Sequence, residues 1–323
     1  IYLDELESVW LGTSSGGVNV YFRNAAKFAH YQKNENVENS LRSNTICSIL
    51  QDQDGLIWIG TLEGGLSILN RTTGVYTHHD KLSTSKNNSV LSLLQDRDGI
   101  IWVGTWGEGF NSYNKETGDI KYYRDNYKDK KSMLSNGTIL CLYEDKRGLI
   151  WIGTYGGGLY AFDKNAESYV SYNTANGLSG NIITKVFEDS SGILWIATDG
   201  GGINSLDYSS GKINTYKNKE KKNTISSNTV YGIYEDRQKN MWFGTANGLN
   251  KLEVSTGKFT SYYLKDGLPN ESIWGLVGDE KGNLWMSTNK GITRFNPLIE
   301  NIDGGAFRNY DIYDGVQSDE FIQ

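Results

Sequence analysis

Hydrophobic and polar positions alternate along this chain in short runs that are divided by turn-forming residues. Between residues 43 and 80, apolar runs occupy 43–52, 56–61, 66–70 and 75–80. Clusters rich in Asp, Gly and Thr separate them. Short runs of β-branched and aromatic residues with such boundaries predict β-strands joined by hairpins. We therefore expect four strands here, and the same succession recurs along the chain.

The second strand of each repeat carries Trp-Ile-Gly-Thr or a close variant. The seven copies begin at Trp10, Trp58, Trp102, Trp151, Trp195, Trp242 and Trp285, and successive copies lie 43 to 49 residues apart. Self-similarity at this period is typical of a β-propeller, in which each repeat forms one four-stranded sheet. We predict an all-β, seven-bladed β-propeller with four antiparallel strands per blade.

The two ends of the chain resemble two parts of one repeat. Residues 314–323 look like the start of a repeat, and residues 1–10 look like its continuation. We expect the N- and C-terminal segments to share blade 1, lie side by side and close the ring, so that no sheet edge stays unpaired. The prediction is a single domain over residues 1–323. Because a natural chain seldom begins within a strand, we expect a longer parent protein.

An Asp lies six residues before every one of these tryptophans, and in five repeats a Gly follows three residues after the Asp. This spacing predicts a tight hairpin turn. Glu7 and Lys239 occupy the Gly position of the first and sixth repeats, so we expect those two turns to differ. A residue present in every repeat is expected to hold the repeat together. Function is therefore sought where the copies differ.

Composition narrows the choice of function. The formal net charge is −6 and the basic residues are scattered, so no nucleic-acid partner is predicted. No run approaches 18 apolar residues, so we predict no membrane segment within this sequence. Cys47 and Cys141 fall in the first strands of blades that are not neighbours. We expect buried free thiols there and no disulfide.

Signatures of catalysis are missing from the sequence. There are three histidines, without the Cys/His spacing of a zinc site, and neither a nucleophile elbow nor a phosphate loop. The Asp turn differs by one residue in spacing from the Asp-box of sialidase-like propellers. We predict no catalytic residue, no metal and no cofactor. Paired carboxylates can cleave glycosidic bonds, so a carbohydrate-active hydrolase or lyase remains an alternative.

Aromatic and polar residues vary at one face of the predicted blades, where the turn after each Thr lies beside the loop that enters each first strand. The candidate ligand-binding residues are Trp106, Glu108, Tyr155, Asp199, Tyr231, Trp274, Glu63, Asn247 and Asn289. Rings beside carboxylates and amides suit a sugar, which stacks its C–H face and hydrogen-bonds its hydroxyls. The alternative, that the rings pack between blades, is favoured for Trp274 because it lies in an inner strand.

The repeats resemble the two-component regulator propeller repeat along the whole chain. EDKRGLIWIGTYGGGLYAFD (144–163) and EDSSGILWIATDGGGINSLD (188–207) are the closest matches to its pattern. The resemblance implies the extracytoplasmic sensor domain of a bacterial hybrid two-component histidine kinase, in which two propellers commonly precede a β-sandwich, a membrane helix and a kinase. Such sensors often respond to glycan breakdown products, and other bacteria attach the repeats to diguanylate cyclases. The resemblance implies no catalytic residues in the propeller, and the family has no single ligand motif to carry over.

These features leave three hypotheses for the function. The first is a non-catalytic sensor on the periplasmic or extracellular side of a bacterial inner-membrane protein, which binds an oligosaccharide or similar polar small molecule. Binding would shift the arrangement of a homodimer, with a neighbouring propeller or sandwich domain as a further partner. The second is a passive scaffold or dimerisation propeller whose ligand binds elsewhere. The third is the carbohydrate-active enzyme, because propellers host all three roles.

Overall fold

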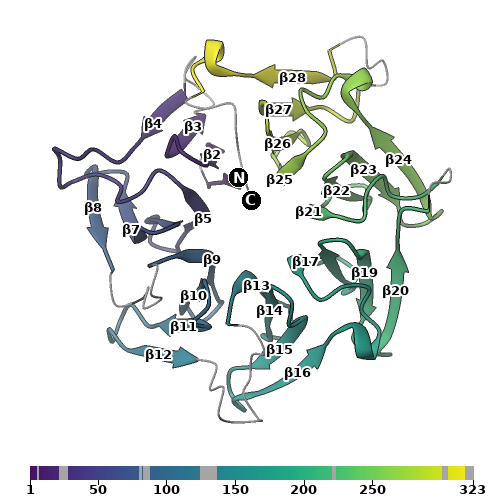
Figure 1. Cartoon of the computed structure of the whole chain (residues 1–323), viewed down its shortest axis with the longest axis horizontal. Coiled ribbons are helices and arrows are strands. Elements are labelled where there is room, and N and C mark those ends of the chain that lie inside the picture. The colour runs from purple at the N-terminus through teal and green to yellow at the C-terminus, as the bar shows by residue number, and fades with distance from the viewer. Residues whose placement is uncertain are drawn as a thin grey trace. The chain divides into compact units, whose positions relative to one another are not determined.

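The chain folds as a seven-bladed β-propeller in which each blade is a sheet of four antiparallel strands (Figure 1). The computed structural model describes residues 1–5, 7–21, 28–79, 82, 88–123, 137–219, 223–299 and 305–316. Within these ranges, strand order in every sheet follows chain order, so that β1 to β4 form blade 1 and β25 to β28 form blade 7. The predicted fold class is confirmed.

Strand bounds repeat closely from blade to blade. The first strands are β1 (Tyr2–Leu3), β5 (Ile46–Gln51), β9 (Val90–Gln95), β13 (Ile139–Glu144), β17 (Ile183–Glu188), β21 (Val230–Glu235) and β25 (Ile273–Gly278). The second strands, which carry the Trp, are β2 (Val9–Gly12), β6 (Ile57–Thr61), β10 (Ile101–Thr105), β14 (Ile150–Thr154), β18 (Leu194–Thr198), β22 (Met241–Thr245) and β26 (Leu284–Thr288).

The remaining strands complete each sheet. The third strands are β3 (Val18–Tyr21), β7 (Gly65–Asn70), β11 (Phe110–Tyr113), β15 (Leu159–Asp163), β19 (Gly202–Asp207), β23 (Gly248–Glu253) and β27 (Gly291–Phe295). The fourth strands are β4 (Phe28–Tyr31), β8 (Val75–His78), β12 (Ile120–Tyr123), β16 (Ser168–Tyr172), β20 (Lys212–Tyr216), β24 (Lys258–Tyr262) and β28 (Phe307–Tyr310). Short 3-10 helices follow three of them, at Thr174–Asn176, Leu264–Asp266 and Ile312–Asp314.

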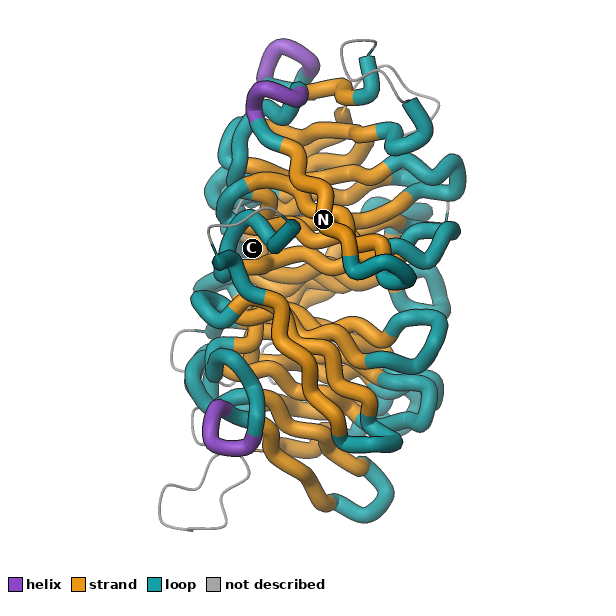
Figure 2. Tube along the Cα trace, turned by 90° about the vertical axis from the view of Figure 1, so that its right-hand side faces the viewer, coloured by secondary structure: helices purple, strands orange, loops and turns teal. Residues whose placement is uncertain are grey.

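Because the strands of a blade are antiparallel, successive turns lie at alternate ends of the sheet (Figure 2). One end, here called the Asp side, carries the turn between the first and second strands and the turn between the third and fourth. The other end, the Thr side, carries the turn between the second and third strands and the loop that enters the first strand. All nine candidate residues lie on, or next to, Thr-side segments.

The structure explains why an Asp lies six residues before each Trp. In every blade the indole Nε1–H of the Trp donates to one carboxylate oxygen of this Asp, at 2.7 to 3.0 Å. The other oxygen accepts backbone N–H groups of the turn, as Asp52 does from Asp54 and Leu56. One carboxylate thus fixes a turn and orients a ring that is itself buried.

The Thr that ends each second strand closes the opposite end. Its hydroxyl donates to the carbonyl oxygen of the residue that starts or precedes the third strand, at 2.8 to 2.9 Å in all seven blades. Each of these threonines is buried. The repeated Asp, Trp and Thr therefore serve the architecture, as the sequence indicated.

The turns at Glu7 and Lys239 correct one expectation. We expected them to differ from the turns with Gly, but Glu7 and Lys239 adopt the same left-handed conformation, with φ of 56° and 64° against 78° for Gly55. The backbone bond is also the same, because the N–H of Lys239 donates to the Asp236 carbonyl as that of Gly55 donates to Asp52. The strand pairing and the Asp bonds impose this turn even where a side chain makes it unfavourable.

The blades fall into two compact units, which are described separately: unit 1 is residues 1–30 and 187–323, and unit 2 is residues 31–186. In unit 2, Trp102 of blade 3 packs with Ile150 and Phe162 of blade 4. In unit 1, Trp242 of blade 6 packs with Leu284 and Phe295 of blade 7. The Trp of one blade thus fills the space against the next. The prediction of a single domain remains a prediction.

Blade 1 packs against blade 7 within unit 1. Val9 and Leu11 share a core with Trp285 and Ile292, and β1 lies beside β25. Residues 317–323, which carry the predicted closure by the C-terminal segment, lie outside the described residues. The closing strand therefore stays a prediction. No helix among the described residues is long and apolar enough to span a bilayer.

Both cysteines are free thiols, but only Cys141 is fully buried; Cys47 is half-buried. Burial raises the pKa of the Cys141 thiol to about 12 and that of Cys47 to about 11. The expectation of buried free thiols is therefore confirmed for Cys141 and wrong for Cys47. Cys47 has no partner in the strand ladder, because Ile46 pairs with Thr61 and Ser48 pairs with Gly60.

Candidate functional site

The Thr side of each blade has a constant backbone frame. In blades 2, 3, 4 and 6 the residue after the Thr donates its N–H to a carbonyl oxygen just before the first strand of the same blade. The pairs are Leu62 to Thr45, Trp106 to Ser89, Tyr155 to Thr138 and Ala246 to Thr229, at 3.0 to 3.3 Å. The variable residue after the Thr is thereby fixed beside the entry of the inner strand.

A β-bulge occurs at one equivalent position of these inner strands. In β25, Ile273 pairs with Thr288 and Gly275 pairs with Ser287, so Trp274 has no partner in the ladder. The same shift leaves out one residue in each of four other blades: Cys47, Leu91, Leu140 and Tyr231. A bulge releases a side chain from the alternation of the strand. Each of these five residues is half-buried although its preceding neighbour is buried.

In unit 1 the bulged residues are aromatic and lie together. The ring centroids of Tyr231 and Trp274, from neighbouring blades, are 4.2 Å apart with an interplanar angle of 33°. The Trp274 indole N–H donates to Asn289 Oδ1 at 2.5 Å. Trp274 thus contacts the preceding blade, as expected for a packing residue, and yet keeps part of its surface exposed.

Asp199 extends this group to a third blade. Its carboxylate accepts a hydrogen bond from the Thr229 hydroxyl at 2.8 Å and is exposed. Burial raises the pKa of Tyr231, and the negative charge of Asp199 raises it further. Asp199, Tyr231, Trp274 and Asn289 therefore form one connected cluster, here called the aromatic cluster, from blades 5, 6 and 7.

Asn247 is exposed in the Thr-side turn of blade 6. Its backbone N–H donates to the Thr245 hydroxyl at 3.0 Å, and its side-chain amide donates to the Ser226 carbonyl at 3.4 Å. These bonds serve the turn. Asn247 is thus a less direct candidate than Asn289, whose amide oxygen orients an aromatic ring.

In unit 2 the rings of Trp106 and Tyr155 are 51% and 53% exposed. A Cβ placed on Gly107 would meet no atom within 4 Å, so the space beside Trp106 is open. Glu63 is exposed in the corresponding turn of blade 2 and holds φ = 65°, with its N–H bonded to the Ser89 hydroxyl at 3.2 Å. Glu108 is half-buried. The candidates of unit 2 thus combine open rings with carboxylates.

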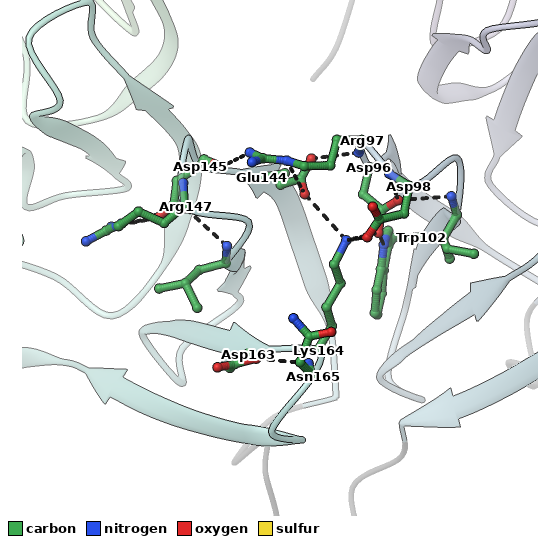
Figure 3. Close-up of polar contacts among 12 residues, drawn as sticks. Asp96, Arg97, Asp98, Trp102, Glu144, Asp145, Arg147, Asp163, Lys164 and Asn165 are labelled. Carbon is green, nitrogen blue, oxygen red and sulfur yellow. Dashed lines mark hydrogen bonds and ion pairs between the residues drawn. The ribbon is translucent and has the colours of Figure 1, made fainter.

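The Asp side carries a network of ion pairs that was not predicted from the sequence (Figure 3). Lys164 of blade 4 binds Asp96 at 2.7 Å and Asp98 at 2.6 Å, both in the Asp turn of blade 3. Arg97, in the Asp turn of blade 3, forms an ion pair at 3.1 Å with Glu144 of blade 4. Lys115 of blade 3 binds Asp52 and Asp54 of blade 2 in the same way. The signal was a Lys at the same turn position in two repeats, Asn114-Lys115 and Asp163-Lys164.

These two ends differ in what they can do. The Asp side joins neighbouring blades, because its carboxylates already hold lysines, arginines and indoles. The Thr side offers exposed rings, amides and carboxylates, which suit binding of a polar ligand with apolar faces. Within the part of the chain that the structure describes, no three His, Cys, Asp or Glu side chains are grouped to hold a metal ion.

Comparison with known proteins gives the same architecture. The family model of the two component regulator propeller matches six of the repeats, at residues 40–63, 84–107, 133–156, 177–200, 224–247 and 267–290. No curated protein matches the sequence.

Two structures of the extracellular domain of BT4673 from B. thetaiotaomicron resemble the chain. One is described as a one component system and the other as a hybrid two component system. Their identities are 26% and 25% over 96% and 97% of this chain, with TM-scores of 0.58 and 0.57. This chain spans 42% of the length of each.

Virginiamycin B lyase from Staphylococcus aureus has the same fold, with 19% identity over 82% of this chain and 84% of the lyase and a TM-score of 0.64. At that identity the likeness concerns the fold alone.

The chain is therefore a propeller domain like the extracellular domains of hybrid two component systems. Its seven Trp-anchored blades and the six matched repeats place it in the two component regulator propeller family.

Proposed function

We propose that this propeller is the ligand-sensing module of a bacterial membrane-bound two-component regulator and that it binds an oligosaccharide or similar polar small molecule outside the cytoplasm. The observation that carries the proposal is the aromatic cluster. Tilted rings of two blades contact each other there beside a carboxylate and an amide. The likeness to extracellular domains of such regulators supports the location.

The cluster has the parts that saccharide recognition uses. A ring face accepts the C–H face of a pyranose, and Asp199 and Asn289 can hydrogen-bond hydroxyls. Asn289 orients Trp274, and Thr229 orients Asp199, so both groups are fixed before the ligand arrives. Pre-positioned groups lose less conformational entropy on binding. Signalling then requires that the ligand favour one arrangement of a homodimer over another.

A thermal-shift screen against soluble mono- and oligosaccharides tests the proposal. A ligand present at 100 times its dissociation constant adds about 2.7 kcal/mol to the stability of the folded protein. We expect a selective upward shift for one saccharide class. Trp274→Ala and Asp199→Asn should weaken binding of that saccharide, measured by calorimetry, by about tenfold or more. In unit 2, we expect Trp106→Ala to weaken ligand binding at the exposed rings of that unit without unfolding the domain.

The matched control is Tyr122→Ala on the outer strand β12, where an exposed ring should leave binding unchanged. A flat panel would favour the passive scaffold, in which the ligand binds elsewhere. Turnover of a bound saccharide into products would favour the carbohydrate-active enzyme instead. Equal loss of stability and of binding in the Trp106 variant would make Trp106 a packing residue.

A further inference from the structure

The bulge occurs in unit 2 with a different set of side chains. Leu91 and Leu140 occupy the bulged positions of blades 3 and 4, where unit 1 has Tyr231 and Trp274. The strands that carry them, β9 and β13, are neighbours, because the Ser92 hydroxyl bonds to the Ile139 carbonyl at 3.4 Å. Equivalent positions on adjacent strands place the two leucines on the same surface.

Both leucines are only half-buried, next to strand residues that are buried. Leu91 is half-buried between Val90, which is fully buried, and Ser92, and Leu140 lies likewise between Ile139 and Cys141. Ordinary alternation would send Leu91 to the face opposite both neighbours, but the bulge removes it from the ladder. The bulge therefore leaves part of each leucine side chain exposed at the Thr side.

The backbone frame brings an aromatic residue to each leucine. The N–H of Trp106 bonds to Ser89, two residues before Leu91, and the N–H of Tyr155 bonds to Thr138, two residues before Leu140. Trp106 and Tyr155 are half-exposed. Each of the two blades thus contributes one leucine and one ring to the Thr side of unit 2.

We propose that Leu91, Trp106, Leu140 and Tyr155 form an apolar subsite that takes an aryl or alkyl group of a small-molecule ligand. Four apolar side chains from two blades are too few for a protein interface, but they suffice for one ring or a short alkyl chain. The open space at Gly107 leaves room for such a group. Glu63 and Glu108 in the neighbouring turns favour a neutral or cationic ligand over an anionic one.

The subsite deepens the proposed function, and its role in sensing rests on that function. It names the chemical class of a ligand that unit 2 binds: a molecule that carries an exposed aryl or alkyl group.

A sugar-free probe tests the subsite independently of the sugar. We expect 4-fluorophenol, titrated into the wild-type domain and followed by fluorine NMR, to bind with a millimolar dissociation constant. The double variant Leu91→Thr/Leu140→Thr should weaken this binding about fivefold or more, because it removes apolar surface. Thr suits the test because the fifth repeat carries Thr184 at this position.

The matched control is Val170→Thr on the outer strand β16, which removes an exposed apolar side chain of the same unit. It should leave 4-fluorophenol binding unchanged. Equal binding by the double variant, or no binding by the wild type, would overturn the subsite. Leucine-dependent binding of 4-fluorophenol with a flat saccharide panel would leave the subsite standing and reject only the saccharide sensor.

Discussion

Individual carboxylates do more than one task in this protein. One oxygen of each Asp-turn carboxylate accepts backbone N–H groups, and the other accepts the indole N–H of the Trp six residues later. In blades 2 and 3 the second oxygen also receives a Lys from the next blade. Such a buried carboxylate satisfies several donors at once. Its removal would leave several donors unsatisfied at once.

Lys239 offers a test of backbone strain at the residue scale. It holds φ = 64° in a turn where most repeats have Gly. We expect Lys239→Gly to stabilise the domain by about 1 kcal/mol, because Gly adopts the left-handed conformation without steric cost. Chemical denaturation measures the change. Lys258→Gly within strand β24 is the control and should destabilise, because a Gly inside a strand loses more backbone entropy on folding.

At the scale of elements, turns couple neighbouring blades in unit 2. The Lys in the turn between the third and fourth strands of one blade reaches the Asp turn of the preceding blade, from Lys164 to Asp96 and Asp98 (Figure 3). Lys164 is largely covered, with 13% of its side chain exposed. Its contacts are thus less screened than those of a surface pair.

Acid should weaken this coupling. The hydrogen bond from Lys164 lowers the pKa of Asp98, so the stability that it contributes is present above the unfolded-state pKa of about 4 and is lost as the pH falls through the folded-state pKa. We expect Lys164→Met to be less stable than the wild type at pH 6. The difference should shrink below about pH 3.

Urea denaturation at a series of pH values measures this difference. Lys121→Met is the control, because Lys121 pairs with Glu167 at an exposed site and should contribute little at any pH. A difference between the wild type and Lys164→Met that stays constant with pH would show that the coupling is not ionic.

The sequence predicted the repeat and its strands because both follow from local patterns. The Trp spacing and the Asp turn are visible in one dimension, and the structure confirms four strands per blade. The bulges could not be predicted, because Leu91 and Tyr231 look like ordinary strand residues and the extra residue is apparent only in the pairing. The contact of Tyr231 with Trp274 was also hidden, since it joins different blades. Lys239 adopts a left-handed conformation that is unfavourable for Lys, because the pairing of the flanking strands fixes the turn.

At the scale of the whole molecule, the prediction of a single domain can be tested by thermal unfolding, because one domain should unfold in one transition. Trp151 in unit 2 and Trp242 in unit 1 are fully buried. We expect replacement of either by Ala to cost about 3–5 kcal/mol. If residues 1–323 are one domain, both variants should shift the same single thermal transition, measured by calorimetry.

Two separated transitions, each sensitive to only one of these variants, would show that units 1 and 2 unfold independently. A cost below about 1 kcal/mol for Trp151→Ala would contradict the structural role assigned to the repeated Trp.

The bulged position has a consequence for how such proteins diversify. Cys, Leu, Tyr and Trp already stand at equivalent bulges within this one chain, on the same backbone. The ladder bonds and the Asp–Trp bonds do not involve these side chains. Mutations there can therefore change what the surface recognises while these bonds stay in place. Duplicated copies of such a gene can acquire new ligands by a few substitutions, while selection on stability acts on a separate set of residues.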